Sequence, residues 1–309
     1  MIGRIVEIAD DKRHLFLHRG FMVVQATDGE RKELGQVPID DIAAVIANAH
    51  GISYTNNLLV ALAERGTPFV LCGANHNAAG MLITVDGNYN QAKRFDAQIG
   101  ATKPTHKRLW AEIVRSKLQQ QASVLEAIGH NPIQLTALAN RVKSGDPDNL
   151  EAQGARKYWT MLFGDDFRRD QNSSGINSLL NYGYTVLRAS TARATIAAGL
   201  HPTISLFHSN ANNAMRLVDD LMEPFRPMID LKVWQLAQQN ETEINPSSKR
   251  ALVHVLYDDM QSSDGATPIM VSIQRLATSL AQVYLGERDK LDLPLQGLPL
   301  DLASSLGDE

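Results

Sequence analysis

The hydrophobic period of the sequence changes once, from two residues to about three and a half, and this change limits the folds open to the chain. Through residue 85, short runs rich in Val, Ile and Phe alternate with polar turn clusters such as Thr27–Glu30. Segments of this kind predict a small antiparallel β structure, most favourably a sandwich. One helix is expected within it, from Thr55 to Arg65, because Leu58 and Leu62 share a face behind Thr55 as the cap.

From residue 105 to about residue 285 the hydrophobic pattern is helical almost throughout, and its breaks carry Gly, Pro, Asn or Asp. The expected helices span residues 105–128, 132–143, 151–163, 174–198, 209–222, 226–240, 248–260 and 267–285. The sequence therefore predicts an α+β multidomain chain with a small N-terminal β-sandwich containing one helix, followed by a larger all-α domain. The predicted parts are the sandwich (1–85), a linker (86–104), the all-α domain (105–286) and an acidic C-terminal tail (287–309).

Composition excludes several classes of protein. A single cysteine, Cys72, leaves no disulfide framework and no cysteine-based zinc site, and it fits a reducing, cytoplasmic compartment. No run approaches the roughly 20 apolar residues of a membrane span, and the first residues lack the apolar core of a signal peptide. The sequence also lacks a phosphate-binding Walker loop, a Gly-x-Ser-x-Gly elbow and a His-Glu-x-x-His helix.

The net charge of −4 gives no sign of a basic nucleic-acid binder. However, residues 287–309 hold six acids and two bases, so the rest of the chain is neutral. A stretch around residues 103–117 is locally basic, and local fields rather than the sum decide whether DNA is bound.

With cysteine unavailable, histidine and carboxylates are the candidates for chemistry. His208 precedes an expected helix that ends with Asp219, Asp220 and Glu223. Acidic side chains at this spacing repel one another, and near a helix C-terminus they also oppose the helix dipole. A bound cation would offset both unfavourable interactions. The alternative is a solvated acidic helix end beside Arg226, which is favoured when this segment is considered alone.

A second candidate is Glu151, at the start of another expected helix. Asp148 can cap this helix, and Glu151 would then complete a capping box, which explains the residue without any catalytic role. Basic residues that could hold the phosphates of a phosphodiester substrate follow, or lie on the preceding long helix: Arg156, Lys157, Arg168, Arg169, Lys107 and Arg108.

Five segments, in this order and spacing, resemble one family: the CRISPR-associated integrase of spacer acquisition, in the branch that accompanies type II systems. The segments are Val70–Asn77, Asn149–Trp159, Asn177–Tyr184, Gly199–His208 and Asp219–Pro227. No single segment is specific, but the ordered set is.

The resemblance implies an N-terminal β-sandwich through which a homodimer forms, and a helical catalytic domain. It also implies a divalent metal held by Glu151, His208 and Glu223, with Asp220 as a near-site partner or alternate ligand. One imidazole with two carboxylates suits Mg²⁺ or Mn²⁺. Many relatives have Gly where this sequence has Ala152.

The implied activity is that of a metal-dependent DNA endonuclease and integrase, which inserts prespacer DNA into the repeat array by transesterification from a 3′-hydroxyl. The implied partners are double-stranded DNA and a small ferredoxin-like CRISPR-associated protein. Two alternatives remain at this point: a non-catalytic DNA-binding scaffold of the adaptation complex, and a metal-dependent hydrolase of small phosphoesters.

Overall fold

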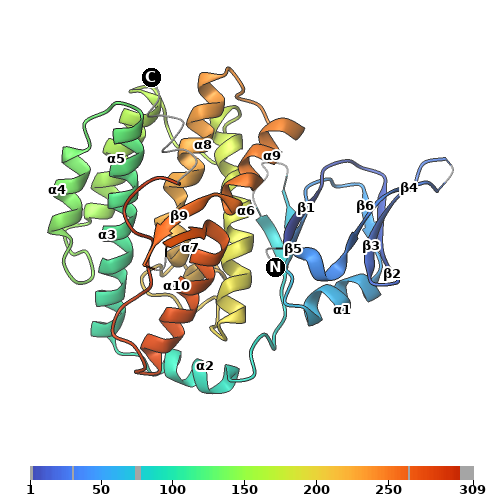
Figure 1. Cartoon of the computed structure of the whole chain (residues 1–309), viewed down its shortest axis with the longest axis horizontal. Helices are drawn as coiled ribbons and strands as arrows, with labels where there is room; N and C mark the ends of the chain where they lie inside the picture. The colour runs from blue at the N-terminus through green and yellow to red at the C-terminus, as the bar shows by residue number, and fades with distance from the viewer. Residues whose placement is uncertain (1–2, 30, 74–77, 264, 300–309) are drawn as a thin grey trace. The chain divides into compact units, whose positions relative to one another are not determined.

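The computed structural model of the chain describes residues 3–29, 31–73, 78–263 and 265–299. The chain divides into two compact units, Met1–Tyr89 and Asn90–Glu309, which are drawn in Figure 1. The first is rich in β-strands and the second is larger and mainly helical, so the prediction of an α+β chain is confirmed.

The N-terminal unit contains two four-stranded sheets and one α-helix. In the first sheet the strand order is β1 (Arg4–Ile8), β5 (Ile42–Ala47), β7 (Phe69–Cys72) and β8 (Ala78–Leu82). In the second it is β4 (Glu33–Pro38), β3 (Phe21–Ala26), β2 (Arg13–His18) and β6 (Ile52–Tyr54). Residues 74–77, the end of the first segment that resembles the family, lie outside the described residues.

Both sheets and the helix α1 (Asn56–Glu64) contribute to one hydrophobic core. Leu15 and Phe69 enter it from different sheets, and Leu58 enters it from the helix. The predicted cap is confirmed, because the Thr55 side chain accepts a hydrogen bond from the backbone N–H of Leu58. Burial of these side chains provides the main stabilisation of the unit.

The prediction that these strands are antiparallel is only partly right. Strands β2, β3 and β4 form an antiparallel meander, and β7 pairs with β8 in the same way. However, β1 pairs with β5, β5 with β7, and β2 with β6 in parallel. The physical reason is that β5 pairs with β1 only after the chain has passed through the meander of the other sheet. The chain can therefore re-enter the first sheet at β5 in the same direction as β1, which makes the two strands parallel.

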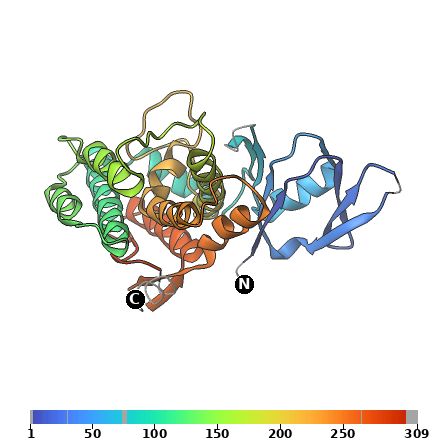
Figure 2. The same cartoon turned by 90° about the horizontal axis from the view of Figure 1, so that it is seen from above.

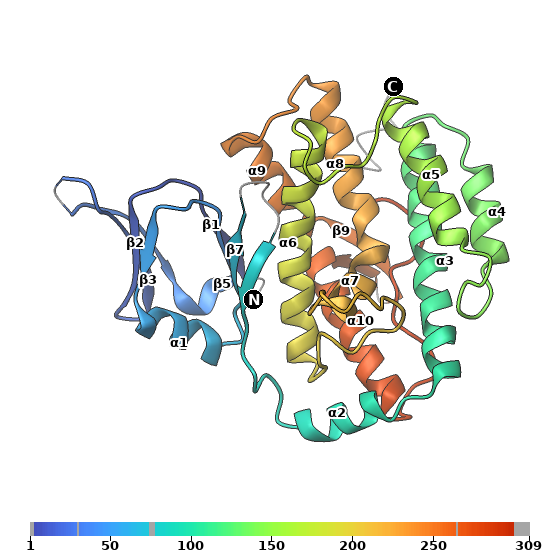
Figure 3. The same cartoon turned by 180° about the vertical axis from the view of Figure 1, so that it is seen from behind.

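The helical unit comprises nine α-helices in the described residues, seen from behind in Figure 3 and from above in Figure 2. They are α2 (Gln91–Ile99), α3 (Lys103–Ala127), α4 (Ile133–Arg141), α5 (Leu150–Phe163), α6 (Ile176–Ala197), α7 (Arg216–Met222), α8 (Arg226–Gln238), α9 (Pro246–His254) and α10 (Ile269–Tyr284). Helices α7 and α8 pack against both α3 and α6, while α4 and α5 contact α3. The junction between α7 and α8 is therefore enclosed by the two longest helices.

Three expectations about this unit are wrong. Residues 86–104 are not merely a linker, because α2 lies within them. The unit is not all-α, because β9 (Asp259–Ser262) and β10 (Gly265–Pro268) form an antiparallel hairpin. The expected helix over 209–222 begins only at Arg216, since the residues before it form the loop that carries His208.

The described part of the acidic tail, residues 287–299, packs against the helices. Leu291 is buried, and its backbone N–H donates to the carboxylate of Glu112. The Gln120 amide donates to the carbonyl of Leu295 over 2.7 Å. Residues 300–309 lie outside the described residues, and within the described ones no helix has the length and apolar character needed to span a membrane.

Candidate active site

The carboxylates of Glu151 and Glu223 meet at the ammonium group of Lys117. Lys117 lies on α3, Glu151 is the second residue of α5, and Glu223 begins the 3-10 turn Glu223–Phe225 between α7 and α8. Lys117 Nζ is 2.6 Å from Glu223 Oε2 and also forms an ion pair with Glu151 Oε1. Lys117 is only 7% exposed and Glu223 5% exposed. The structure thus brings together two of the predicted site residues through a cation that was not among the residues predicted from the sequence.

The start of α5 explains how Glu151 reaches this position. The side chain of Asp146 accepts the backbone N–H groups of Leu150 (2.9 Å) and Glu151 (3.0 Å), so Asp146, and not Asp148, satisfies the first turn. The predicted capping box is therefore wrong, and the Glu151 side chain does not serve in that role. It pairs with Lys117 instead.

A close approach of two helices supports the same pair. A Cβ atom added to Gly154 would lie 2.2 Å from Leu118 Cδ2, which is much closer than real contacts allow. Gly154 follows Glu151 by one helical turn, and Leu118 follows Lys117. The absence of a side chain at residue 154 therefore lets α5 lie close enough to α3 for the ion pair to form.

Glu223 lies between two cations. Its Oε1 atom is 2.9 Å from Arg226 Nε, whereas its other oxygen, Oε2, contacts Lys117. Burial acts to raise the pKa of Glu223, but Arg226 and Lys117 outweigh it, so the pKa is lowered. Burial acts to lower the pKa of Lys117, but Glu223 and Glu151 outweigh it, so that pKa is raised. The alternative of a solvated acidic helix end is thus wrong, because this end is buried and ion-paired.

Asp220 organises the loop that carries His208. Its carboxylate is 0% exposed and accepts the backbone N–H groups of Leu206 (2.7 Å) and Phe207 (3.1 Å). It also lies 2.5 Å from His208 Nδ1, and this hydrogen bond raises the pKa of His208. A ring held at Nδ1 presents Nε2 to a ligand, as metal-binding histidines commonly do. The structure places Asp220 behind His208, where it positions the imidazole.

Other residues hold the same loop from further away. The amide of Gln98, on α2, donates to the carbonyls of His201 (3.1 Å) and Ile204 (2.9 Å). Trp110 stacks on Phe207 with ring centroids 4.5 Å apart and presents an edge contact to His208. Gln98 was not predicted as a site residue because it lies in the expected linker, and an isolated Gln carries no pattern that would reveal it.

The neighbouring Asp219 serves a different purpose. Arg188 Nε donates to its Oδ1 atom over 2.7 Å, and the Asn213 amide donates to Oδ2 over 2.6 Å. Asp219 therefore fastens α7 to α6, and of the three acids in this segment only Asp220 and Glu223 contact the candidate site.

Glu151, Glu223 and His208 are the side chains of this site that could bind a divalent metal ion. Within the described ranges, which omit residues 1–2, 30, 74–77, 264 and 300–309, no group of three or more His, Cys, Asp or Glu side chains is arranged to hold a metal ion. Glu151 and Glu223 nevertheless already converge on one cation, and His208 interacts electrostatically with Glu223. Carboxylate oxygens are the ligands that Mg²⁺ and Mn²⁺ prefer, so the chemical types of these side chains are suitable for such an ion.

The residues on and after α5 that were predicted to contact DNA differ in exposure and in their hydrogen-bond partners. Arg156, Lys157 and Arg168 are exposed, and Lys157 Nζ donates to Gln134 Oε1 over 2.9 Å. Arg169 is partly buried, and its guanidinium donates to the side chains of Asn177 (2.9 Å) and Asn181 (2.7 Å). Arg169 thus has a structural role that the sequence pattern did not indicate.

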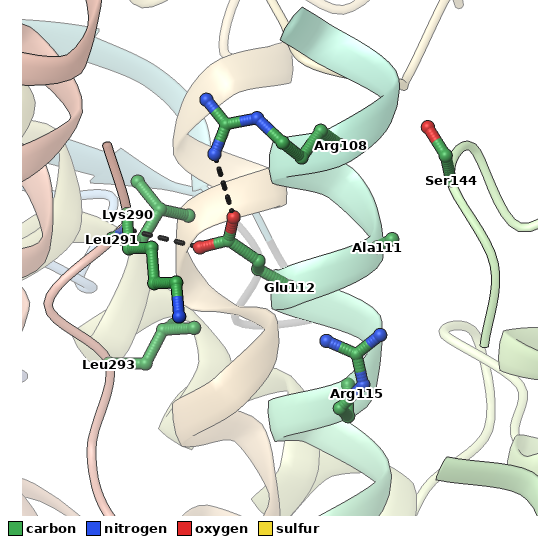
Figure 4. Close-up of a pocket in the computed structure, with 8 residues that line it drawn as sticks. All are labelled: Arg108, Ala111, Glu112, Arg115, Ser144, Lys290, Leu291 and Leu293. Carbon is green, nitrogen blue, oxygen red and sulfur yellow. Dashed lines mark hydrogen bonds and ion pairs between the residues drawn. The ribbon is translucent and has the colours of Figure 1, made fainter. Parts of the chain in front are cut away.

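The predicted contacts on α3, Lys107 and Arg108, are exposed, and Arg108 lines a cavity of about 400 Å³. The close-up in Figure 4 shows the residues around this cavity: Arg108, Ala111, Glu112, Arg115, Ser144, Lys290, Leu291 and Leu293. Glu112 is already paired with Arg108 at 3.0 Å. Three basic side chains face a single acid here, so the cavity favours an anionic group.

Known proteins resemble this chain over nearly its whole length. The sequence model of a family described as CRISPR associated protein Cas1 matches residues 6–259. A CRISPR-associated endonuclease Cas1 from Neisseria meningitidis serogroup C (strain 8013) is 34% identical over 93% of this chain and 94% of its own length.

Two solved structures share the fold. A casposase bound to integration product superimposes with a TM-score of 0.79 at 18% identity, covering 94% of this chain and 92% of that one. A chain of a Cas6-RT-Cas1–Cas2 complex superimposes with a TM-score of 0.76 at 16% identity, covering 96% of this chain and 36% of that one.

Proposed function

The chain belongs to the Cas1 family of CRISPR-associated proteins, and on this premise we propose that it is a DNA endonuclease and integrase of CRISPR adaptation. The sequence relative from Neisseria meningitidis is an endonuclease, and a structural neighbour is bound to an integration product. The observation that carries the proposal is the convergence of two carboxylates, the partly exposed Glu151 and the buried Glu223, on one lysine. A third carboxylate, Asp220, positions the nearby His208.

Glu151, Glu223 and His208 would hold one Mg²⁺ or Mn²⁺ ion. Such an ion would supply Lewis-acid chemistry there, lowering the pKa of the attacking hydroxyl and polarising the scissile phosphate. The protein supplies the positioning. Asp220 fixes the His208 ring through Nδ1, so that Nε2 is the ligand atom, and Arg226 keeps Glu223 ionised.

The proposed reaction at this site is a transesterification. A DNA 3′-hydroxyl gives up its proton, and its oxygen forms a new bond to a phosphorus atom of the repeat as the old phosphorus–oxygen bond breaks. The leaving oxygen takes up a proton, so protons balance overall. The number of phosphodiester bonds is unchanged, so no external energy source is required. Water in place of the 3′-hydroxyl makes the same site an endonuclease.

Basic side chains would hold the phosphates on either side of the reacting one. The exposed Arg156, Lys157 and Arg168 are candidates, together with Arg108 and Arg115 at the cavity in Figure 4. Such contacts position the duplex without reading its sequence. Their attraction depends on salt, because binding releases counterions from the DNA.

The proposed partners are double-stranded DNA, a second copy of the chain joined through the N-terminal unit as a sandwich dimer, and a small ferredoxin-like CRISPR-associated protein. One structural neighbour forms part of a Cas1–Cas2 complex, which supports a protein partner of this kind. We propose a cytoplasmic location, which the single cysteine supports.

A second candidate function is a non-catalytic DNA-binding scaffold. One observation favours it: Glu151 and Glu223 are already neutralised by Lys117 and Arg226, as purely structural ion pairs would be. The two functions differ in a direct way, since a scaffold binds DNA without cutting or joining it.

The test is an integration assay with prespacer DNA, a repeat-containing plasmid, Mg²⁺ or Mn²⁺ and the purified partner protein. We expect Glu151→Gln to lose strand transfer by about 100-fold or more while it retains DNA binding. Glu126→Gln is the matched control, because Glu126 is exposed on the same helix as Lys117. Equal activity of Glu151→Gln and wild type would refute the catalytic assignment, and binding by wild type without any cleavage or joining would establish the scaffold.

A further inference from the structure

The position of Lys117 is unusual for a lysine. Its ammonium group is buried in the middle of the helical unit, between carboxylates that come from α5 and from the turn after α7. Lysine is rarely buried this deeply, because desolvating its charge costs several kcal/mol unless good partners compensate. Here two carboxylates compensate at once.

The same two carboxylates are the predicted metal ligands, and both already contact one cationic group. Oxygen atoms of Glu151 and Glu223 both contact the single Nζ atom of Lys117. A Mg²⁺ ion requires its oxygen ligands at about 2.0–2.1 Å, which is closer than an ammonium nitrogen approaches. An ion at this distance withdraws negative charge from the carboxylates and repels the nearby ammonium group, so the ion and Lys117 compete for these oxygens.

Charge balance leads to the same conclusion. Glu151 and Glu223 carry two negative charges, and Lys117 with Arg226 carries two positive charges, so the cluster is neutral as it stands. A divalent cation added to it would leave two uncompensated positive charges in a buried site. Withdrawal of the ammonium reduces this excess, whereas Arg226 contacts the other oxygen of Glu223, Oε1, and can remain in place.

We propose that Lys117 is an internal counter-ion that competes with the divalent metal for Glu151 and Glu223. It holds the two carboxylates together before an ion arrives, and it weakens the affinity of the site by requiring the ion to displace it. The inference rests on the proposed function in one respect, which is that it takes Glu151 and Glu223 as metal ligands.

The test uses the full-length chain with Lys117 replaced by Met, which keeps much of the length of the side chain and removes its charge. Mn²⁺ binding is measured by calorimetry, and thermal unfolding is followed with chelator and with Mn²⁺. We expect Lys117→Met to bind Mn²⁺ at least 10-fold more tightly than wild type. We also expect Mn²⁺ to raise the melting temperature of Lys117→Met by several degrees more than that of wild type. The reason is that the metal relieves the repulsion between the two carboxylates, which lack the lysine in this variant.

Two further variants serve as controls. Lys93→Met removes an exposed lysine from α2 and should leave Mn²⁺ binding unchanged, which excludes a general effect of net charge. Glu151→Gln removes one of the two carboxylates and should lose Mn²⁺ binding by 10-fold or more.

The outcomes separate this inference from the proposed function. If Glu151→Gln loses Mn²⁺ binding but Lys117→Met binds no more tightly than wild type, the competition is refuted and the proposed ligands stand. Equal binding by Glu151→Gln and wild type would overturn both. If Lys117→Met folds only with Mn²⁺, the ion has replaced the ammonium and the inference is supported; failure to fold even with Mn²⁺ would overturn it.

Discussion

Asp220 holds His208 twice, although twelve residues separate them: Oδ1 is 2.5 Å from the ring nitrogen Nδ1 and 3.4 Å from the backbone nitrogen of the same histidine. The other oxygen, Oδ2, accepts the N–H groups of Leu206 and Phe207. One buried carboxylate thus fixes both the ring and the backbone of the candidate ligand. A loop that lacks regular secondary structure gains a defined geometry in this way.

We expect Asp220→Asn to loosen this loop without unfolding the protein. The amide that replaces the carboxylate has a single acceptor oxygen and no charge, so it cannot satisfy all the groups that Asp220 now accepts. Amide hydrogen exchange at residues 206–208 should accelerate by about 10-fold or more, and strand transfer should fall by about 10- to 100-fold. Asp219→Asn is the matched control, since it weakens the contact with Arg188 and leaves these amides in place. Unchanged exchange in Asp220→Asn would contradict the positioning role.

Gly154→Ala should separate α5 from α3. The new Cβ atom would overlap Leu118, so the helices must move apart or Leu118 must change rotamer, at a cost of about 1–3 kcal/mol in the free energy of unfolding. Because the ion pair between Glu151 and Lys117 lies one turn away, DNA strand transfer should fall as well. Urea denaturation measures the first effect. Combining Gly154→Ala with Leu118→Ala should cost less than the sum of the single changes; strict additivity would show that the two residues do not meet.

The buried Asp230 on α8 predicts a pH dependence of stability. Burial raises the pKa of this carboxyl from 3.8 to about 7, in spite of the hydrogen bond that Tyr184 donates to it. Since the folded-state pKa is the higher one, the stabilisation is complete at low pH and is lost as the pH rises toward 7. Asp230→Asn keeps an acceptor for Tyr184 but cannot ionise.

The free energy of unfolding of Asp230→Asn, minus that of wild type, should therefore increase between pH 4 and pH 7. The slope should be at most about 1.4 kcal/mol per pH unit, with a plateau above pH 7. Urea denaturation across this pH range tests the expectation. A difference that does not change with pH would mean that Asp230 is ionised throughout.

Two adjacent arginines should respond differently to the same substitution. Arg168→Gln should reduce the salt dependence of DNA binding, by about one unit of slope for each phosphate that the guanidinium neutralises, with little change in stability. Arg169→Gln should lower the free energy of unfolding by about 1–3 kcal/mol, because it removes the guanidinium that donates to Asn177 and Asn181. Filter binding at several salt concentrations and thermal unfolding distinguish the two. An unaltered stability of Arg169→Gln would return that residue to the DNA-binding set.

Much of the architecture could be predicted from the sequence because it depends on local patterns. The change of hydrophobic period located the β-rich and helical regions, and Thr55 was identified correctly as a cap. Parallel pairing of β1 with β5 could not be predicted in the same way. It depends on which distant segment returns to which edge, and alternation of side chains does not encode direction.

For the candidate site, the sequence by itself determined the chemical groups: His208, the acids around it, Glu151 and the basic residues nearby. The order of five segments also determined the family. Only the tertiary structure decided what each group contacts. In the folded chain, Asp220 contacts the His208 loop and Asp219 pairs with Arg188. Glu151 and Glu223 both pair with Lys117. The reason is physical: the partners lie on different helices, and their meeting depends on how closely the helices pack, as at Gly154, which no local pattern records.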